Sequence, residues 1–358
     1  MTTTLLREPV DELTRRRLLT GGAAAGLLIA AEGGVVVGPA AGAEPEGGAF
    51  PVTIEHKYGR TEIPAEPKRV VVVGEIEQDT LLALGIVPLA ATEWLGDPPP
   101  PGAIQPWAQD NLGDAPVPEV LDVFTAGPQF ERIAALRPDL ILAVFSFIER
   151  SDYDRLAQIA PTVAQPEGFL NYGAPWQLMT RTVGRAVGQP ERAEHLVADV
   201  EARFAEARAA HPEFARATAL VVAPAGDGNY YAWPPPDTAG KFLADLGFLA
   251  PAGVAELAPE SGGTLVQVSG ERVDLFDADV LIWLVENASQ SDEIRANPLY
   301  AGLDVATQGR DIFVFGETEV LTNAMFFSTV LSLPFAIDGL VPMLATAVDG
   351  DPTTTTGL

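Results

Sequence analysis

Two stretches of the sequence repeat one phrase. Glu131–Leu142 reads ERIAALRPDLIL, and Glu271–Ile282 reads ERVDLFDADVLI. Each copy starts with Glu-Arg and an aliphatic residue, and each places an aspartate at the same distance before a fully apolar run. Fully apolar runs are typical of strands that are buried on both faces of a parallel sheet. The repetition therefore predicts two copies of one unit, in which a helix, a loop that ends in aspartate and a buried strand follow one another.

The segments around the two copies follow the same order. In the first half, Pro51–Ile63 predicts a β-hairpin and Val70–Val73 a buried strand, before a helix that ends at Gly85. In the second half, Thr218–Ala223 predicts a strand, followed by a loop and then by a helix that ends at Gly247. Strands that alternate with helices in this way form mostly parallel, doubly wound sheets.

Two helices are expected between the halves. The first covers Trp176–Val187, and the second runs from Pro190 to about Ala210. Proline at the first position and acidic residues in the first turn are helix-start signals, and the apolar residues that follow recur with the helical period. About 20 residues at about 1.5 Å each span roughly 30 Å, which is long enough to join two lobes. We therefore expect an α/β fold of two lobes with mostly parallel sheets, joined by a single long α-helix.

The N-terminus has the features of an export signal. Thr14–Leu19 contains three consecutive arginines, a short apolar run covers Gly21–Ala31, and Ala41-Gly42-Ala43 resembles a cleavage site. The apolar run is too short to span a bilayer permanently. The position after Ala31, where a lipoprotein would carry its acceptor cysteine, is Glu32. We therefore expect a twin-arginine-type signal peptide without a lipid anchor, and a mature protein that is extracytoplasmic and either soluble or associated with the cell envelope.

These patterns divide the whole chain. The expected boundaries are 1–43 for the signal peptide, 44–50 for a linker, 51–174 for the N-terminal lobe, 175–211 for the helical segment, 212–347 for the C-terminal lobe and 348–358 for a disordered tail.

Composition excludes several classes of function. The formal net charge is −27, and an acidic chain repels phosphate backbones, so we expect no nucleic-acid partner. The chain has no cysteine, which excludes disulfides, zinc–thiolate sites, iron–sulfur clusters and cysteine nucleophiles. Its three histidines are too few for a His-rich metal receptor. We therefore expect no intrinsic cofactor and no metal ligated by the protein.

Several phrases together resemble one family. They include RVVV at 69–72, LLALGIVP at 81–88, IAALRPDLI at 133–141 and IAPTV at 159–163. Each is weak alone, but in this order and spacing they are similar to the iron-siderophore and vitamin B12 class of ABC-transporter substrate-binding proteins. The resemblance covers roughly Ile54 to Leu344 and implies two Rossmann-like lobes, a ligand between them and modest closure around it.

The resemblance also implies partners. The ligand would be a ferric siderophore, which supplies all the iron ligands itself, and the partner would be an ABC permease. In this family a surface glutamate on each lobe docks against permease arginines, and the matching positions here are Glu131 and Glu271. We expect a monomer.

Ligand contacts are expected in the loops beyond the carboxyl ends of the strands, where open α/β sheets bind ligands. A Tyr-Tyr-Ala-Trp group in a Gly/Pro-rich loop is the most informative candidate, because aromatic rings suit broad, partly apolar ligands. Trp176, by contrast, is expected to be a core residue. The scarcity of basic candidates favours a neutral or cationic, hydroxamate-type chelate over an anionic tris-catecholate. The candidates are Glu75, Trp94, Phe147, Arg150, Tyr230, Tyr231, Trp233 and Asn287.

Other functions are weighed against this one. Haem or cobalamin could be the ligand within the same class. A secreted α/β enzyme is the rival class, but the chain has no G-x-S-x-G, P-loop, dinucleotide fingerprint or H-E-x-x-H in a suitable context. We therefore expect a binding protein rather than an enzyme.

Overall fold

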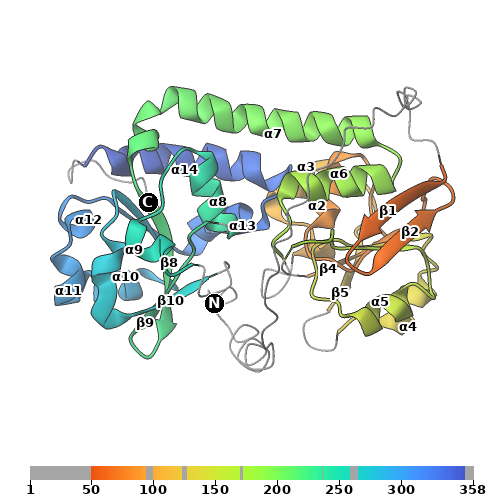
Figure 1. Cartoon of the computed structure of the whole chain (residues 1–358), viewed down its shortest axis with the longest axis horizontal. Helices are drawn as coiled ribbons and strands as arrows, with labels where there is room; N and C mark the ends of the chain where they lie inside the picture. Colours follow the sequence, from red (N-terminus) through yellow and green to blue (C-terminus); the bar gives the residue numbers. More distant parts are fainter. Residues whose placement is uncertain are drawn as a thin grey trace, which may run out of the picture.

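Two α/β lobes lie beneath one long helix in the computed structural model of the chain (Figure 1). The structure describes residues 50–93, 100–122, 127–169, 172–235, 237–258 and 265–350. The expected signal peptide, Trp94 and residues 351–358 lie outside the described residues. No helix in the described ranges is both long and apolar enough to cross a membrane.

The N-terminal lobe is built on a parallel sheet with the strand order β5-β4-β3-β6-β7. The predicted hairpin is confirmed as β1 (Val52–His56) and β2 (Gly59–Ile63). The sheet strands are β3 (Val70–Val72), β4 (Ala90–Thr92), β5 (Glu119–Leu121), β6 (Leu140–Ala143) and β7 (Thr162–Ala164). Its helices are α2 (Glu77–Ala83), η1 (Pro101–Ala103), η2 (Pro106–Ala108), α3 (Gln109–Leu112), α4 (Phe130–Ala135) and α5 (Arg150–Leu156).

The C-terminal lobe has a mixed sheet with the order β10-β9-β8-β11-β12, in which β9 is antiparallel to both neighbours. Its strands are β8 (Ala219–Gly226), β9 (Asn229–Ala232), β10 (Val266–Ser269), β11 (Val280–Leu284) and β12 (Asp311–Val314). Its helices are η3 (Pro212–Arg216), α8 (Thr238–Asp245), α9 (Ala252–Ala255), η4 (Gly270–Phe276), α10 (Ala288–Ala296), α11 (Pro298–Ala301), α12 (Asp304–Thr307), η5 (Gly316–Thr318), α13 (Glu319–Phe327) and α14 (Ser332–Val348).

The prediction that Tyr230 and Tyr231 lie in a loop is wrong. Both residues lie in β9, which forms a hairpin with β8. The turn consists of Asp227 and Gly228, and both have positive φ, 51° and 73°. Two consecutive positive-φ residues form the tight turn whose twist matches that of the strands, and Asp-Gly is a favoured pair for it.

The repeated phrase has the same place in both lobes. Counted along the chain, each sheet has the order third, second, first, fourth, fifth, and the repeated strands β6 and β11 are the fourth strands. The repeated aspartates explain the register. Asp139 accepts hydrogen bonds from the backbone N–H groups of Lys68 and Arg69, both at 2.8 Å. Asp279 accepts them from the N–H and the hydroxyl of Thr218, at 2.8 and 2.9 Å. Each carboxylate thus fastens the start of the fourth strand to the start of the first.

One difference separates the two copies. The segment before β6 is the α-helix α4, as predicted, whereas the segment before β11 is the 3-10 element η4, which is kinked at Arg272. The prediction of a helix in the second copy is therefore correct in position and wrong in type.

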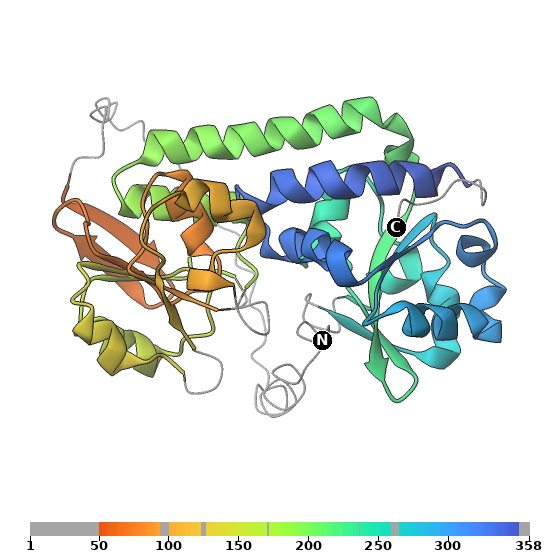
Figure 2. The same cartoon turned by 180° about the vertical axis from the view of Figure 1, so that it is seen from behind.

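The long connecting helix is confirmed as α7 (Pro190–Ala210), preceded by α6 (Trp176–Ala186). Its apolar face, which includes Val197, Val200 and Phe204, is buried. Helix α14 lies beneath α7 in both views (Figures 1 and 2), and Arg203 of α7 pairs with Asp338 of α14. A single buried cluster contains core residues of both lobes, so the lobes share a continuous apolar core along these helices.

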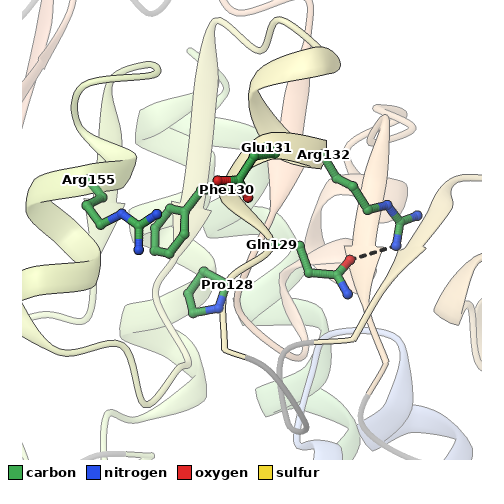
Figure 3. Close-up of a pocket in the computed structure, with 6 residues that line it drawn as sticks. All are labelled: Pro128, Gln129, Phe130, Glu131, Arg132 and Arg155. Carbon is green, nitrogen blue, oxygen red and sulfur yellow. Dashed lines mark hydrogen bonds between the residues drawn. The ribbon is translucent and has the colours of Figure 1, made fainter.

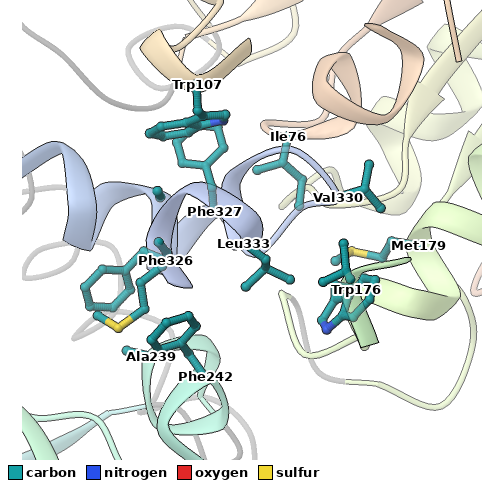
Figure 4. Packing of buried hydrophobic residues seen from close by; sticks show 14 of the residues in the cluster. Ile76, Trp107, Trp176, Met179, Ala239, Phe242, Phe326, Phe327, Val330 and Leu333 are labelled. Carbon is teal, nitrogen blue, oxygen red and sulfur yellow. The ribbon is translucent and has the colours of Figure 1, made fainter. Parts of the chain in front are cut away.

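A second junction between the lobes lies at the C-terminal end of α13 (Figure 4). Phe327 packs edge-on against Trp107 of the N-terminal lobe, with ring centroids 5.0 Å apart. Asp79 of α2 accepts hydrogen bonds from Trp107 Nε1 at 2.8 Å and from Thr329 Oγ1 at 2.6 Å. This buried contact joins the two lobes independently of α7, and the sequence analysis did not predict it.

Candidate ligand-binding site

The strand order of each sheet reverses between the first and fourth strands. In open α/β sheets, ligands bind outside the carboxyl ends of the strands at such a point. In the N-terminal lobe this point lies between β3 and β6, and the loops that follow these strands contain Glu75 and Phe147. The two loops are connected because the Glu75 N–H donates to the Phe145 carbonyl at 3.0 Å.

Glu75 contacts a cluster of three aromatic residues, Tyr172, Phe145 and Phe147, through the Tyr172 hydroxyl. Its side chain is buried, and its Oε1 accepts a hydrogen bond from the Tyr172 hydroxyl. The Tyr172 ring contacts two phenylalanine rings, with centroid distances of 4.5 Å to Phe145 and 4.1 Å to Phe147. Phe147 remains 51% exposed, which is unusual for so large an apolar side chain. Tyr172 was missed by the sequence analysis, because a single tyrosine in a long loop has no local pattern.

Burial shifts the pKa values of both Glu75 and Tyr172. Loss of solvent raises the pKa of Glu75 well above its ordinary value; the hydrogen bond from Tyr172 opposes this rise, and the nearby Glu77 adds to it. Burial also raises the pKa of Tyr172 well above its ordinary value. Glu75 Oε2 is buried and has no hydrogen-bond partner among the described residues. Burial therefore favours the uncharged form of both the Glu75 carboxyl group and the Tyr172 phenol.

Glu77 has a different role. Its carboxylate accepts hydrogen bonds from the backbone N–H groups of Ile76, Val144 and Phe145, so it fastens the β3 loop to the β6 loop. The carboxylate lies so close to the chain that a Cβ atom on Gly74 would be 2.0 Å from Glu77 Oε1. Gly74 and Glu77 together shape the loop that presents Glu75.

The aromatic residues at and after β9 point to both faces of the sheet, because consecutive side chains along a strand alternate between faces. Tyr230 packs edge-on against Phe276 and Trp283 in the core of its own lobe. The Tyr231 ring instead faces Trp233, with ring centroids 6.3 Å apart. Trp233 in turn packs edge-on against Phe326 of α13, with ring centroids 5.4 Å apart. Tyr231 and Trp233 are half-buried, and Trp233 packs against the apolar cluster that the two lobes share.

The other candidates are placed as follows. Arg150 begins α5, where its guanidinium donates to Asp154 at 2.9 Å and to the Tyr58 carbonyl at 3.3 Å. Asn287 caps α10 by accepting from the Gln290 N–H at 3.2 Å, and its side chain is exposed. Trp176 is a core residue, as expected. The structure thus brings Glu75 and Phe147 together on one lobe and Tyr231 and Trp233 on the other, while Tyr230, Arg150 and Asn287 make contacts elsewhere.

Glu131 and Glu271 occupy matching positions at the start of α4 and η4, and both are exposed. Within the described part of the chain, neither carboxylate has a hydrogen bond or an ion pair. Glu131 lines a shallow hollow of about 480 Å³ with Pro128, Gln129, Phe130, Arg132 and Arg155 (Figure 3). In this hollow the Arg155 guanidinium lies 3.6 Å from the centre of the Phe130 ring.

The described residues contain no group of three or more His, Asp or Glu side chains that could hold a metal ion. The side chains that the structure brings together at the candidate site are mainly aromatic.

Comparisons with known proteins agree with this geometry. The periplasmic binding protein profile matches residues 71–318. A probable siderophore-binding lipoprotein of Bacillus subtilis, YfiY, is 30% identical over 253 residues, which are 67% of this chain and 71% of the relative. The ferric-anguibactin-binding protein FatB of Vibrio anguillarum is 26% identical, over 81% of this chain and 87% of its own.

A solved structure extends the comparison to the fold. The crystal structure of a periplasmic solute binding protein from Mycobacterium smegmatis is similar with a TM-score of 0.72 and 35% identity. The match covers 83% of this chain and 98% of the other.

Proposed function

The chain belongs to the periplasmic binding protein family, and on this premise we propose that it captures a ferric siderophore outside the cytoplasm and delivers it to an ABC permease for iron uptake. One observation carries the proposal. Aromatic rings of both lobes remain partly accessible: Phe147 follows β6 and packs on Tyr172, and Trp233 follows β9 and packs on Phe326 of α13. The names of the relatives YfiY and FatB support the same ligand class.

The ligand is a neutral or cationic chelate of the hydroxamate type. Burial favours the uncharged form of the Glu75 carboxyl group, and the Arg150 guanidinium is paired with Asp154 rather than free to meet the negative charge of a tris-catecholate. A formal net charge of −27 further disfavours a strongly anionic ligand.

Tryptophan quenching tests the ligand class. The mature chain is titrated with a ferric hydroxamate and, separately, with a ferric tris-catecholate, at equal ionic strength. Trp233 should report binding, since its ring is half-buried at the junction. The expected result is a lower Kd for the hydroxamate. Tighter catecholate binding would overturn the assignment of the ligand class but not that of ferric siderophores.

Docking and export complete the proposal. Glu131 and Glu271 are exposed carboxylates in matching places on the two lobes, without an ion pair among the described residues, which suits a pair of contacts to permease arginines. Residues 1–43 act as a twin-arginine-type signal and the mature protein works as a monomer. An intact mass that corresponds to a chain starting near Glu44 is expected for the exported protein, and retention of residues 1–43 contradicts the export proposal.

A further inference from the structure

Tyr172 has an unfavourable backbone conformation. Its φ is 63°, in the left-handed region that side-chain-bearing residues rarely adopt. Such a conformation persists only where the surroundings hold it, and it is often found at functional sites. Here the hydroxyl is held by Glu75, and the ring is held by Phe145 and Phe147.

Glu75 makes an unfavourable contribution of its own. A carboxyl group that is 2% exposed and has one oxygen without a partner among the described residues is costly to bury, and an apolar residue would fill the same space without that cost. The described structure gives the Glu75 side chain one hydrogen bond, the one from Tyr172. The acid is therefore explained by what it does to Tyr172 rather than by the stability of the lobe.

Phe147 shows which surface this arrangement supports. Its ring meets the Tyr172 ring edge-on, at 81°, and half of its side chain remains exposed. Both residues lie at the point in the N-terminal sheet where strand order reverses. Ile76, next to Glu75 in the chain, is buried in the same cluster as Phe327 and Val330 at the junction with the other lobe (Figure 4).

We propose that Phe147 and Tyr172 form the aromatic surface with which the N-terminal lobe contacts the ligand, and that Glu75 is a positioning residue that fixes the Tyr172 ring without touching the ligand. The inference rests on the proposed function and deepens it, because it assigns the N-terminal half of the ligand site. The chemistry it fits is the uncharged organic periphery of a chelate, since rings supported in this way offer broad apolar contact at little cost in entropy.

Five single variants and one double variant test the inference by affinity for one ferric hydroxamate and by thermal stability. Phe147→Ala and Tyr172→Ala should each raise Kd about tenfold. Tyr172→Phe and Glu75→Leu should raise Kd by a smaller, similar factor, and the double variant should be no worse than either single one, because both remove the same hydrogen bond. Glu75→Gln should restore the wild-type Kd, since its amide oxygen still accepts from the Tyr172 hydroxyl.

A matched control is available in the other lobe. Tyr300 is a buried tyrosine whose hydroxyl donates to Asp311 at 2.9 Å. Asp311 is the first residue of β12, so this contact lies at the amino end of the strand, away from the carboxyl ends where ligand contacts are expected. Tyr300→Phe should lower Tm and leave Kd unchanged. If the wild type binds but Phe147→Ala, Tyr172→Ala and Glu75→Leu all bind within twofold of it, the inference is wrong and the proposed function stands. If the wild type binds no ferric siderophore, the proposed function fails, and the inference with it.

Discussion

Asp79 is a fully buried acid at the junction of the two lobes. Burial raises its pKa from the ordinary value to about 6, while the hydrogen bonds from Thr329 and Trp107 act in the opposite direction. The folded protein therefore binds this proton more tightly than the unfolded chain does. The contribution of Asp79 to the free energy of unfolding should therefore be largest below about pH 4. It should fall by roughly 3 kcal/mol as the pH rises to about 6.

Asp79→Asn isolates this effect. The amide oxygen still accepts from Trp107 and Thr329, but the side chain no longer titrates. Urea unfolding of both proteins between pH 4 and pH 7 should show that wild-type stability falls more steeply with pH than that of the variant. Equal pH slopes would show that Asp79 does not carry this dependence. The comparison is needed because Asp237, with its pKa raised to about 7, changes stability in the same direction in both proteins.

Residues differ in how well the sequence predicts them. Asp139 and Asp279 were recognisable because each lies within a repeated local phrase, and the structure gives both the same role. The partners of Asp79 and Glu75 could not be predicted, because Thr329 is 250 residues from Asp79 and Tyr172 is 97 residues from Glu75. Nothing in the sequence near either residue indicates such a contact.

At the scale of elements, the strongest local signals were the most reliable. Helix α7 begins at Pro190 and ends at Ala210 as predicted, because a proline start and a helical period agree along its length. The segment at β9 was predicted as a loop, although Asp227-Gly228 is a favoured hairpin turn, because its four residues are too short to show alternation. Short strands depend on their neighbours in the sheet rather than on their own pattern.

The repeated aspartates give a prediction about these elements. Asp139→Ala and Asp279→Ala should each lower the free energy of unfolding by about 1–2 kcal/mol, because each removes the charged acceptor of at least one backbone N–H group at a strand start. Asp279→Ala also removes the ion pair with Arg310. Asp274→Ala is the matched control, since this exposed carboxylate pairs with Arg272 in the same element. Its effect in the same urea titration should be clearly smaller than that of either repeated aspartate. An equal loss in all three variants would contradict the shared role of the two repeated residues.

At the scale of the whole molecule, the lobes are joined twice. Helix α7 packs on α14 along one side, and the Asp79–Thr329 contact joins the lobes near the candidate site. A continuous apolar core resists a wide hinge motion, so ligand binding should change the arrangement of the lobes only modestly. Under the proposed function, the permease would then meet groups that the two lobes present at a nearly fixed separation.

This rigidity makes the docking residues testable. The double variant Glu131→Gln/Glu271→Gln should bind the ferric siderophore as the wild type does but should not support its uptake by cells that carry the cognate permease. Glu191→Gln is the control, because Glu191 is also an exposed acid in the first turn of a helix. Uptake at the wild-type rate by the double variant would refute the assignment of the docking residues.

The nature of the captured ligand is the central claim, and native mass spectrometry of the protein purified from an iron-limited culture of its producer tests it most directly. The account predicts a mature chain that carries one Fe(III) chelate, with a visible absorption band that disappears when the iron is reduced and removed. A haem or cobalamin adduct, or a chain that stays free of ligand after incubation with the ferric chelates of that culture, would contradict it.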